Sequence, residues 1–271
     1  MTRQRLAASI AVVLVLVASL AACGSGGSSA APSNTTALTI LGAASLKDAL
    51  AKLEAAYETA HPGVTVTVST DSSAALRTQI EQGAPADVFL SADTTNPQKL
   101  VDAGLADGAA LDFAGNLLVI VTPKDNPAKF ASPADLARRG VKVIAAGSEV
   151  PITKYADQAV GLLAKQPGAP TGFAAAYGAN IVSREDNVKA VIAKIELGEG
   201  DAGIVYLTDA MASGKVATIP IPAAANVPAT YAGVAIKISK QLPAAHAFLT
   251  GLIGSDAQAI LAGFGFRPPP A

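Results

Sequence analysis

The sequence predicts an α/β fold in which two lobes enclose a cleft, and three features of the chain lead to this prediction. Segments typical of strands alternate with segments typical of helices from about residue 36 onward. The alternation occurs in two successive runs, and two strand-like crossovers join them. This order favours layered α/β lobes with mostly parallel sheets. We expect residues 37–119 and 232–271 to form the first lobe and residues 120–231 to form the second.

The first run is predicted from periodicity and from residues that start or end helices. A helix is expected over 46–57, because apolar residues recur there at helical spacing between Ser45 and the sequence His61-Pro62-Gly63. Valine and threonine alternate over 64–68, as in a half-buried strand. Ser72 and Ser73 precede a helix over 74–82, which Gly83 ends. The other elements of this run are strands over 38–41, 87–90 and 117–121 and a helix over 96–104.

The second run follows the same rules. Pro151 stands where proline is favoured, at the start of a helix over 151–164, and Asn187 is predicted to cap a helix that continues to Leu197. The strand over 231–238 is expected to return the chain to the first lobe. The other elements are strands over 141–145, 181–182, 202–206 and 216–221 and helices over 132–139, 207–213, 243–253 and 256–263.

The N-terminal residues predict where the protein works. Residues 1–22 form a secretory signal, in which two arginines precede an apolar run that is too short for a comfortable membrane span. The run ends in Leu20-Ala21-Ala22-Cys23, a pattern that resembles a bacterial lipoprotein cleavage site. We therefore expect Cys23 to be lipidated and to anchor the protein on the extracytoplasmic face of the cell membrane, with a plain signal peptide as the alternative. Residues 23–36 are rich in glycine and serine and are expected to form a flexible tether.

The charge balance and the residue pattern exclude several function classes. Removing residues 1–22 takes away two arginines and no acidic residue, which changes the formal net charge from −1 to −3. A weakly acidic body is a poor nucleic-acid binder, because contact with a phosphate backbone needs a basic face. No catalytic set accompanies the candidate residues described next. We therefore expect no enzymatic activity, no cofactor and no site for a free cation.

Hydroxyl groups and helix N-termini follow the predicted strands, where open α/β sheets bind their ligands. Ser45 and Ser73 each lie between a strand and the next helix, and Ile152 and Val188 lie in the first turns of two later helices. The first amides of a helix lack acceptors within it and carry the positive end of its dipole. Tyr206 ends a strand, so its hydroxyl can reach the same place. This pattern predicts a pocket that holds an anion without reacting with it.

Each of these residues also has a simpler interpretation. Ser45, Ser72 and Asn187 can act only as N-caps, which is a common role of serine and asparagine at helix starts. Tyr206 can be a half-buried core residue. Asp87 and Asp93 flank a predicted strand but lack a partner base, and the two histidines lack a partner pattern.

Several short motifs occur in a characteristic order and spacing. The most specific are Gly83-Ala84-Pro85-Ala86-Asp87, within the stretch 79–93, and Gly203-Ile204-Val205-Tyr206. The others are Gly42-Ala43-Ala44-Ser45-Leu46, Asn116-Leu117-Leu118-Val119, Val150-Pro151, Glu185-Asp186-Asn187-Val188 and Gly265-Phe266. Over nearly the whole body, the chain resembles the substrate-binding lipoproteins of molybdate ABC transporters. These have a two-lobed type II periplasmic-binding-protein fold with the ligand cleft between the lobes.

The resemblance implies a set of ligand-binding residues. In that family two serine hydroxyls, a tyrosine hydroxyl and backbone amides hold the oxyanion, and the matching positions are Ser45, Ser73, Tyr206, Ile152 and Val188. Two departures from the family's pattern add secondary candidates, which are Ser72 in place of Ser73 and the hydroxyl of Thr153. The resemblance also implies a monomer that captures molybdate or tungstate and delivers it to the permease subunits of an ABC importer.

The chemistry of the ligand agrees with this implication. Molybdate is a dianion near neutral pH, so a site built only from neutral donors suits it without burying a fixed cation. Hydrogen phosphate would place its own proton against further donors. Sulfate is also a dianion, so a binding protein for sulfate or another tetrahedral oxyanion is the alternative, separated by size alone. An amino-acid binder, a hydrolase or a ferric-ion binder would each need residues that this pattern lacks.

Overall fold

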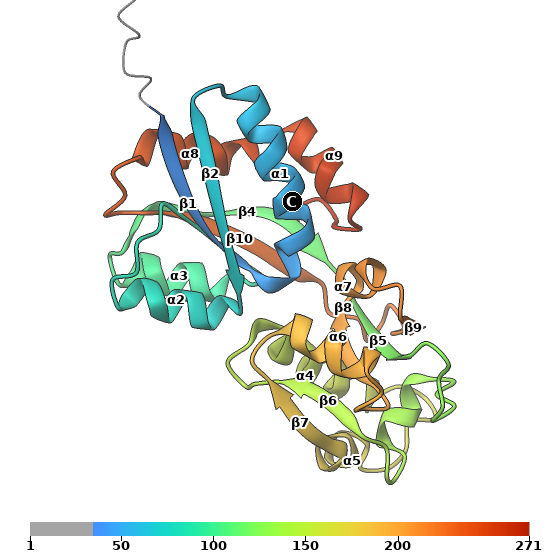
Figure 1. The fold of residues 1–271 in the computed structure, drawn as a ribbon. Coiled ribbons are helices and arrows are strands. Elements are labelled where there is room, and N and C mark those ends of the chain that lie inside the picture. The colour runs from blue at the N-terminus through green and yellow to red at the C-terminus, as the bar shows by residue number, and fades with distance from the viewer. Residues whose placement is uncertain (1–34, 271) are drawn as a thin grey trace, which may run out of the picture. The chain divides into compact units, whose positions relative to one another are not determined.

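The computed structural model describes residues 35–270, and Asn34–Ala271 form one compact unit. Within this unit, two lobes are built on separate sheets (Figure 1). The predicted signal peptide, the lipidation site Cys23 and the tether up to residue 34 lie outside the described residues. Thr36, which was assigned to the tether, is already the first residue of a strand. No helix within 35–270 is long and apolar enough to cross a bilayer.

Lobe 1 is built on a five-stranded sheet with the order β2-β1-β3-β10-β4. The strands β1 and β2 run parallel, as do β1 and β3, whereas β10 runs antiparallel to both of its neighbours. The sheet is buried on both faces, because successive side chains point to opposite sides: Ile40 and Leu41 belong to different apolar clusters. The strands are β1 (Thr36–Ala43), β2 (Val64–Asp71), β3 (Val88–Ser91), β4 (Ala106–Asn116) and β10 (Ala229–Ile236).

Helices cover both faces of the lobe 1 sheet (Figure 1). The helices α2 and α3 lie on one face, where Leu76, Ile80 and Leu100 pack against the sheet. The helices α1 and α8 lie on the other face, with Leu50, Leu53 and Phe248 in the larger core. The helices are η1 (Ala44–Leu46), α1 (Lys47–Ala60), α2 (Ser73–Glu81), α3 (Thr95–Asp102), α8 (Leu242–Gly251) and α9 (Ser255–Gly263).

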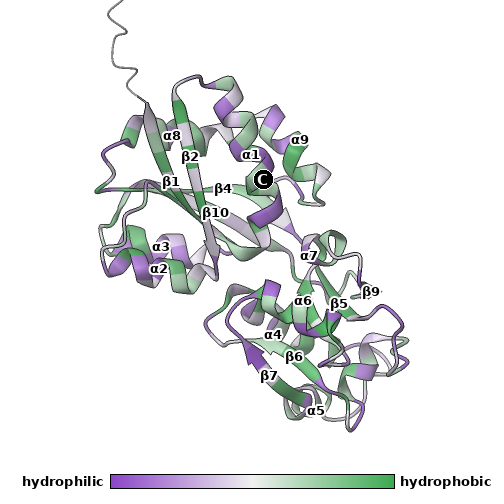
Figure 2. Cartoon of the chain, in the orientation of Figure 1, coloured by the Kyte–Doolittle hydropathy of each residue, from purple (hydrophilic) through white to green (hydrophobic). Residues whose placement is uncertain are grey.

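Lobe 2 contains an antiparallel sheet, β8-β5-β9, and a parallel pair, β6-β7. A parallel bridge between Val143 and Ala202 connects the two. Figure 2 shows hydrophobic residues along β5, β6 and β8, which lie inside the lobe. The strands are β5 (Leu118–Pro123), β6 (Val143–Ala146), β7 (Ile181–Glu185), β8 (Gly203–Tyr206) and β9 (Val216–Pro220). The helices are η2 (Pro133–Ala137), α4 (Pro151–Leu163), α5 (Phe173–Asn180), α6 (Val188–Glu196) and α7 (Leu207–Ala212).

The prediction of mostly parallel sheets is wrong. The sheet around β5 is antiparallel throughout, and β10 makes antiparallel pairs in lobe 1. The reason lies in the connections between the lobes, since β5 and β10 follow the two crossovers and enter each sheet against the direction of its neighbours. The predicted lobe boundaries at 119/120 and 231/232 fall inside β5 and β10, and each of these strands lies wholly in one sheet.

Two elements had no clear signal in the sequence. The strand β4 contains four alanines, two glycines and two aspartates, which are poor strand formers, and its pairing with β10 compensates for this. The helix α5 follows Gly172, which adopts a left-handed conformation and offers no capping side chain. Neither segment therefore shows the residues by which strands and helices are predicted.

Candidate anion-binding site

One pocket collects all five residues that were predicted to bind the ligand. Ser45 and Ser73 come from lobe 1, whereas Ile152, Val188 and Tyr206 come from lobe 2. All five are buried, with between 1% and 6% of their surface exposed, and the cavity between them is about 10 Å³. The pocket is therefore small and lies away from bulk water. The further lining residues are Ala43, Ala44, Ser72, Ala92, Val150, Pro151 and Asn187.

The hydroxyl proton of Ser45 is left for a ligand by a buried hydrogen-bond network. Ser45 Oγ lies 2.8 Å from Tyr231 Oη, and Asn116 Nδ2 donates to the same tyrosine oxygen at 3.2 Å. Burial raises the pKa of Tyr231 well above its usual value, so this hydroxyl keeps its proton. The Tyr231 hydroxyl has one proton to donate, and among the described residues Ser45 Oγ is the acceptor within reach, so we assign Tyr231 as the donor to Ser45. Ser45 then keeps its own proton to donate into the pocket.

The other two serines are also occupied as acceptors. Ser73 Oγ accepts from the amide of Ala92 at 3.0 Å, and Ser72 Oγ accepts from the amide of Ala75 at 3.2 Å. A serine hydroxyl has one proton and two lone pairs, so each oxygen can accept one bond and still donate another. Both residues line the pocket, and both hydroxyl protons are therefore available to an oxyanion there.

Tyr206 presents a protonated hydroxyl at the end of β8. Its ring packs edge-to-face against Tyr155 and Tyr231, with centroid distances of 6.3 and 5.7 Å. Burial, followed by the proximity of Tyr231, raises the pKa of Tyr206 well above its usual value. Its hydroxyl donates to the carbonyl of Ala92 at 3.5 Å, a long and weak contact. A closer and more strongly charged acceptor can replace this partner.

Helix N-termini supply the remaining donors. The helices α2, α4 and α6 begin at Ser73, Pro151 and Val188, and the short helix η1 begins at Ala44. Proline has no amide proton, so Ile152 carries the first available amide of α4. Each of these N-termini contributes residues to the pocket. The positive ends of the helix dipoles therefore favour an anion without a charged side chain.

The structure separates true caps from other roles. Ser72 caps α2, and Asn187 caps α6 through its side-chain oxygen. The interpretation of Ser45 as an N-cap is wrong, because Ser45 lies inside η1, and α1 has no side-chain cap. Thr153 does not line this pocket, since its hydroxyl lies against the carbonyls of Ala146 and Gly147, at 3.0 and 2.8 Å.

Two conspicuous carboxylates have structural roles. Asp87 accepts from the amide of Thr39 in β1 and from the hydroxyl of Ser239 beyond β10, so it ties the returning chain to the sheet. Asp93 accepts from Ser91 and from Asn96, at the start of α3. Among residues 35–270, no cluster of three or more His, Cys, Asp or Glu side chains is placed to hold a metal ion.

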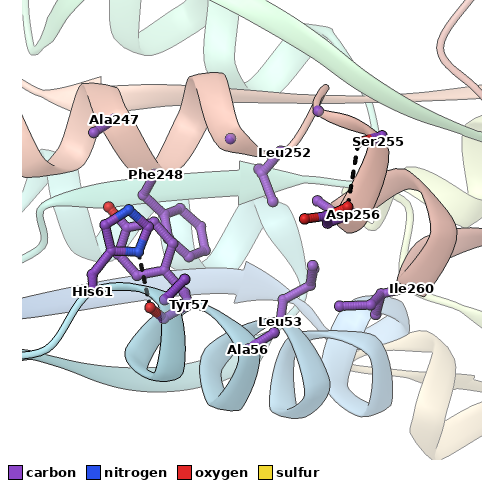
Figure 3. A pocket seen from close by; sticks show the side chains of 14 residues that line it. Leu53, Ala56, Tyr57, His61, Ala247, Phe248, Leu252, Ser255, Asp256 and Ile260 are labelled. Carbon is purple, nitrogen blue, oxygen red and sulfur yellow. Dashed lines mark hydrogen bonds between the residues drawn. The ribbon is translucent and has the colours of Figure 1, made fainter.

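A more spacious pocket lies between α1, α8 and α9, and Figure 3 shows its side chains. Leu53, Phe248 and Ile260 make much of its wall apolar. Its polar groups are engaged locally, as in the bond from His61 to the carbonyl of Tyr57, and it includes the carboxylate of Asp256. An apolar wall with a negative charge suits an oxyanion poorly, so the smaller pocket is the candidate site.

Comparison with known proteins defines the class to which this fold and pocket belong. The family described as bacterial extracellular solute-binding protein matches residues 38–267, and the chain belongs to this family. The molybdate-binding protein ModA of Mycobacterium tuberculosis is 35% identical over 266 residues, which cover 95% of this chain and 96% of ModA. The chain is thus a homologue of molybdate-binding proteins.

Solved structures agree with this assignment. The periplasmic molybdate-binding protein of Azotobacter vinelandii is 26% identical, with a TM-score of 0.73 over 86% of this chain and 100% of that protein. The sulfate-binding protein SubI of Mycobacterium tuberculosis is 23% identical, with a TM-score of 0.77 over 86% of this chain and 87% of that protein. At that identity the second likeness concerns the fold alone. Together they confirm the predicted two-lobed type II periplasmic-binding-protein fold.

Proposed function

We propose that this protein captures molybdate or tungstate outside the cytoplasm and delivers it to the permease of an ABC importer. Three hydroxyls, from Ser45, Ser73 and Tyr206, and two backbone amides, from Ile152 and Val188, donate hydrogen bonds to the oxyanion. The protein acts as a monomer, needs no cofactor, and releases the ligand chemically unchanged. The similarity to molybdate-binding relatives supports this proposal, and so does the pocket lining, which is uncharged and contains serine and tyrosine hydroxyls and several helix N-termini.

The availability of three hydroxyl protons carries the proposal. Ser73 accepts from the amide of Ala92, and Ser45 is assigned as the acceptor from Tyr231, so each has a proton left to donate. Burial keeps Tyr206 protonated, and among the residues lining this pocket none is charged. Such a site binds an anion whose oxygens all accept, which is the case for molybdate and tungstate. Hydrogen phosphate would leave a buried proton unpaired at a cost of about 1–3 kcal/mol.

Sulfate is the second candidate, because it is a tetrahedral dianion and can use the same donors. The likeness in fold to a sulfate-binding protein makes it the natural competitor. Size is the property that separates the two ligands, since a smaller ion cannot reach donors on both lobes at once without a further closure of the pocket.

Calorimetric titration of the purified chain with molybdate, tungstate, sulfate and phosphate tests the proposal. Molybdate and tungstate should bind with affinities within about tenfold of each other, while phosphate should bind far more weakly, by at least the tenfold that 1.4 kcal/mol represents. Tighter binding of sulfate than of molybdate would reassign the ligand. Binding of none of the four would reject the proposed site.

We also propose that Cys23 carries the lipid that anchors the protein to the membrane. The sequence Leu20-Ala21-Ala22-Cys23 supports this proposal, and it lies outside the described residues. The Cys23→Ala variant should move from the membrane fraction to the soluble fraction, and its mass should lack acyl chains. A variant that stays in the membrane fraction with the mass of the parent would contradict the lipid anchor.

A further inference from the structure

Two helix N-termini that reach the pocket from opposite lobes are joined by one pair of side chains. Asn187 Nδ2 donates to Asp71 Oδ1 at 3.1 Å. Asp71 is the last residue of β2 in lobe 1, and Asn187 immediately precedes α6 in lobe 2. We propose that Asp71 and Asn187 are positioning residues, a clasp that holds the lobes closed and sets the spacing of the donors around the oxyanion. The part of this inference that concerns ligand affinity rests on the proposed function.

On the lobe 1 side, Asp71 fixes the start of α2. The oxygen that accepts from Asn187 also accepts from the amide of Ser72, at 2.7 Å. Ser72 is the N-cap of α2, and Ser73 is its first residue. The position of the Asp71 carboxylate therefore determines where the two serine hydroxyls lie in the pocket.

On the lobe 2 side, Asn187 fixes the start of α6. Its side-chain oxygen accepts from the amide of Ala190 at 3.1 Å, which caps the helix. Its side-chain nitrogen is then directed across the cleft to Asp71. The next residue is Val188, whose amide is a proposed ligand donor. One side chain thus orients the amide donor and attaches it to the opposite lobe.

The negative charge of Asp71 indicates that its contact with Asn187 has a role in the site. A carboxylate one residue away from the pocket repels a dianion, so by itself it lowers the affinity of the site. The hydrogen bonds of Asp71 offset this loss of affinity only if they stabilise the closed arrangement of the two lobes. A hydrogen bond to a charged group is among the stronger ones in proteins, and here it links the two lobes.

A serine substitution separates the clasp from the helix cap. Serine caps helices about as well as asparagine, but it cannot extend a second polar group to Asp71. In Asn187→Ser, the melting temperature without ligand should therefore change little, whereas the Kd for molybdate should rise about tenfold or more, mainly through faster dissociation. A protein whose closed state is less populated binds correspondingly more weakly.

Two further variants make the test specific. In a double-mutant cycle of Asn187→Ser with Asp71→Ala, the double variant should lose clearly less affinity than the product of the two single losses, because both remove the same contact. Asp48→Asn is the matched control. It removes another contact between the lobes, the 2.8 Å ion pair between Asp48 and Lys189 of α6. The side chain of Asp48 is 48% exposed. Such a pair contributes little, so the Kd should change by less than about fivefold.

Solution scattering without ligand provides a readout that does not depend on the identity of the ligand. Asn187→Ser should have a larger radius of gyration than the parent, because more molecules are open. An unchanged Kd together with an unchanged radius of gyration would overturn the clasp. If the parent binds none of the oxyanions, the proposed function fails, and the scattering comparison still decides whether the clasp exists.

Discussion

The hydroxyl of Tyr206 offers the sharpest test of the site, because the change Tyr206→Phe removes one oxygen and leaves the ring in place. The ring is 1% exposed and packs against two other tyrosines, contacts that phenylalanine retains. The only change in the pocket is therefore the loss of one donor. This isolates the binding role of the residue from its packing role.

The change Tyr206→Phe should lower the affinity for the ligand much more than it lowers the free energy of unfolding. A hydrogen bond to a charged oxyanion contributes roughly 1.5–3 kcal/mol, so the affinity for molybdate should fall about tenfold to a hundredfold. The protein partner that the hydroxyl loses is the carbonyl of Ala92 at 3.5 Å, the outer limit of a hydrogen bond. The free energy of unfolding without ligand should therefore fall by less than about 0.5 kcal/mol.

The assay is calorimetric titration with molybdate, combined with thermal unfolding of the ligand-free protein. Tyr177→Phe is the matched control, since Tyr177 is also buried in lobe 2 but does not line the pocket. That variant should bind molybdate like the parent. If Tyr206→Phe also binds like the parent, Tyr206 is a core residue without a ligand contact, and the assignment of the site fails at this position.

Three other predictions follow from single contacts. Ser45→Ala leaves the buried hydroxyl of Tyr231 without its acceptor, so unfolding without ligand should become easier by about 1–3 kcal/mol in chemical denaturation. Burial raises the pKa of Asp209 to about 6. The free energy of unfolding of the parent is compared with that of Asp209→Asn by denaturation from pH 4 to 7. The stabilisation of the parent relative to this variant is fully present below pH 4. It should be lost as the pH rises through 6, by about 3 kcal/mol; a difference independent of pH would contradict this. In Gly203→Ala the added Cβ would lie 2.9 Å from the carbonyl oxygen of Ile144, so unfolding should cost about 1–3 kcal/mol less, and an unchanged melting temperature would show that the strand can shift.

Local sequence patterns predict most of the elements that carry the site. Asn187 caps a helix that begins at Val188, and Pro151 is the first residue of α4. Both helix starts can be predicted from the sequence, because a capping asparagine and an initial proline act within one turn. Strand ends followed by helix starts also place Ser45 and Ser73 at one edge of the sheet, since β1 and β2 are parallel and in register from Thr36 to Ala43. These relations involve neighbours in the sequence.

The roles of the hydroxyls needed the three-dimensional structure. The network that frees the proton of Ser45 joins it to Tyr231, which lies 186 residues further along the chain. Tyr231 had been predicted only as part of a strand. The antiparallel entry of β5 and β10 likewise depends on how the chain crosses between the lobes, a property that no local window of sequence contains.

The sequence by itself determined the α/β class, the family and the residues gathered in one pocket, because local periodicity, capping and short motifs encode them. Only the tertiary structure decided which hydroxyl protons are available, that Thr153 lies against other carbonyls, and that Asp71 meets Asn187 across the cleft. The physical reason is that a hydrogen bond depends on distance and direction to within a few tenths of an ångström. Spacing along the chain fixes these only within a turn or a strand, whereas packing fixes them between lobes.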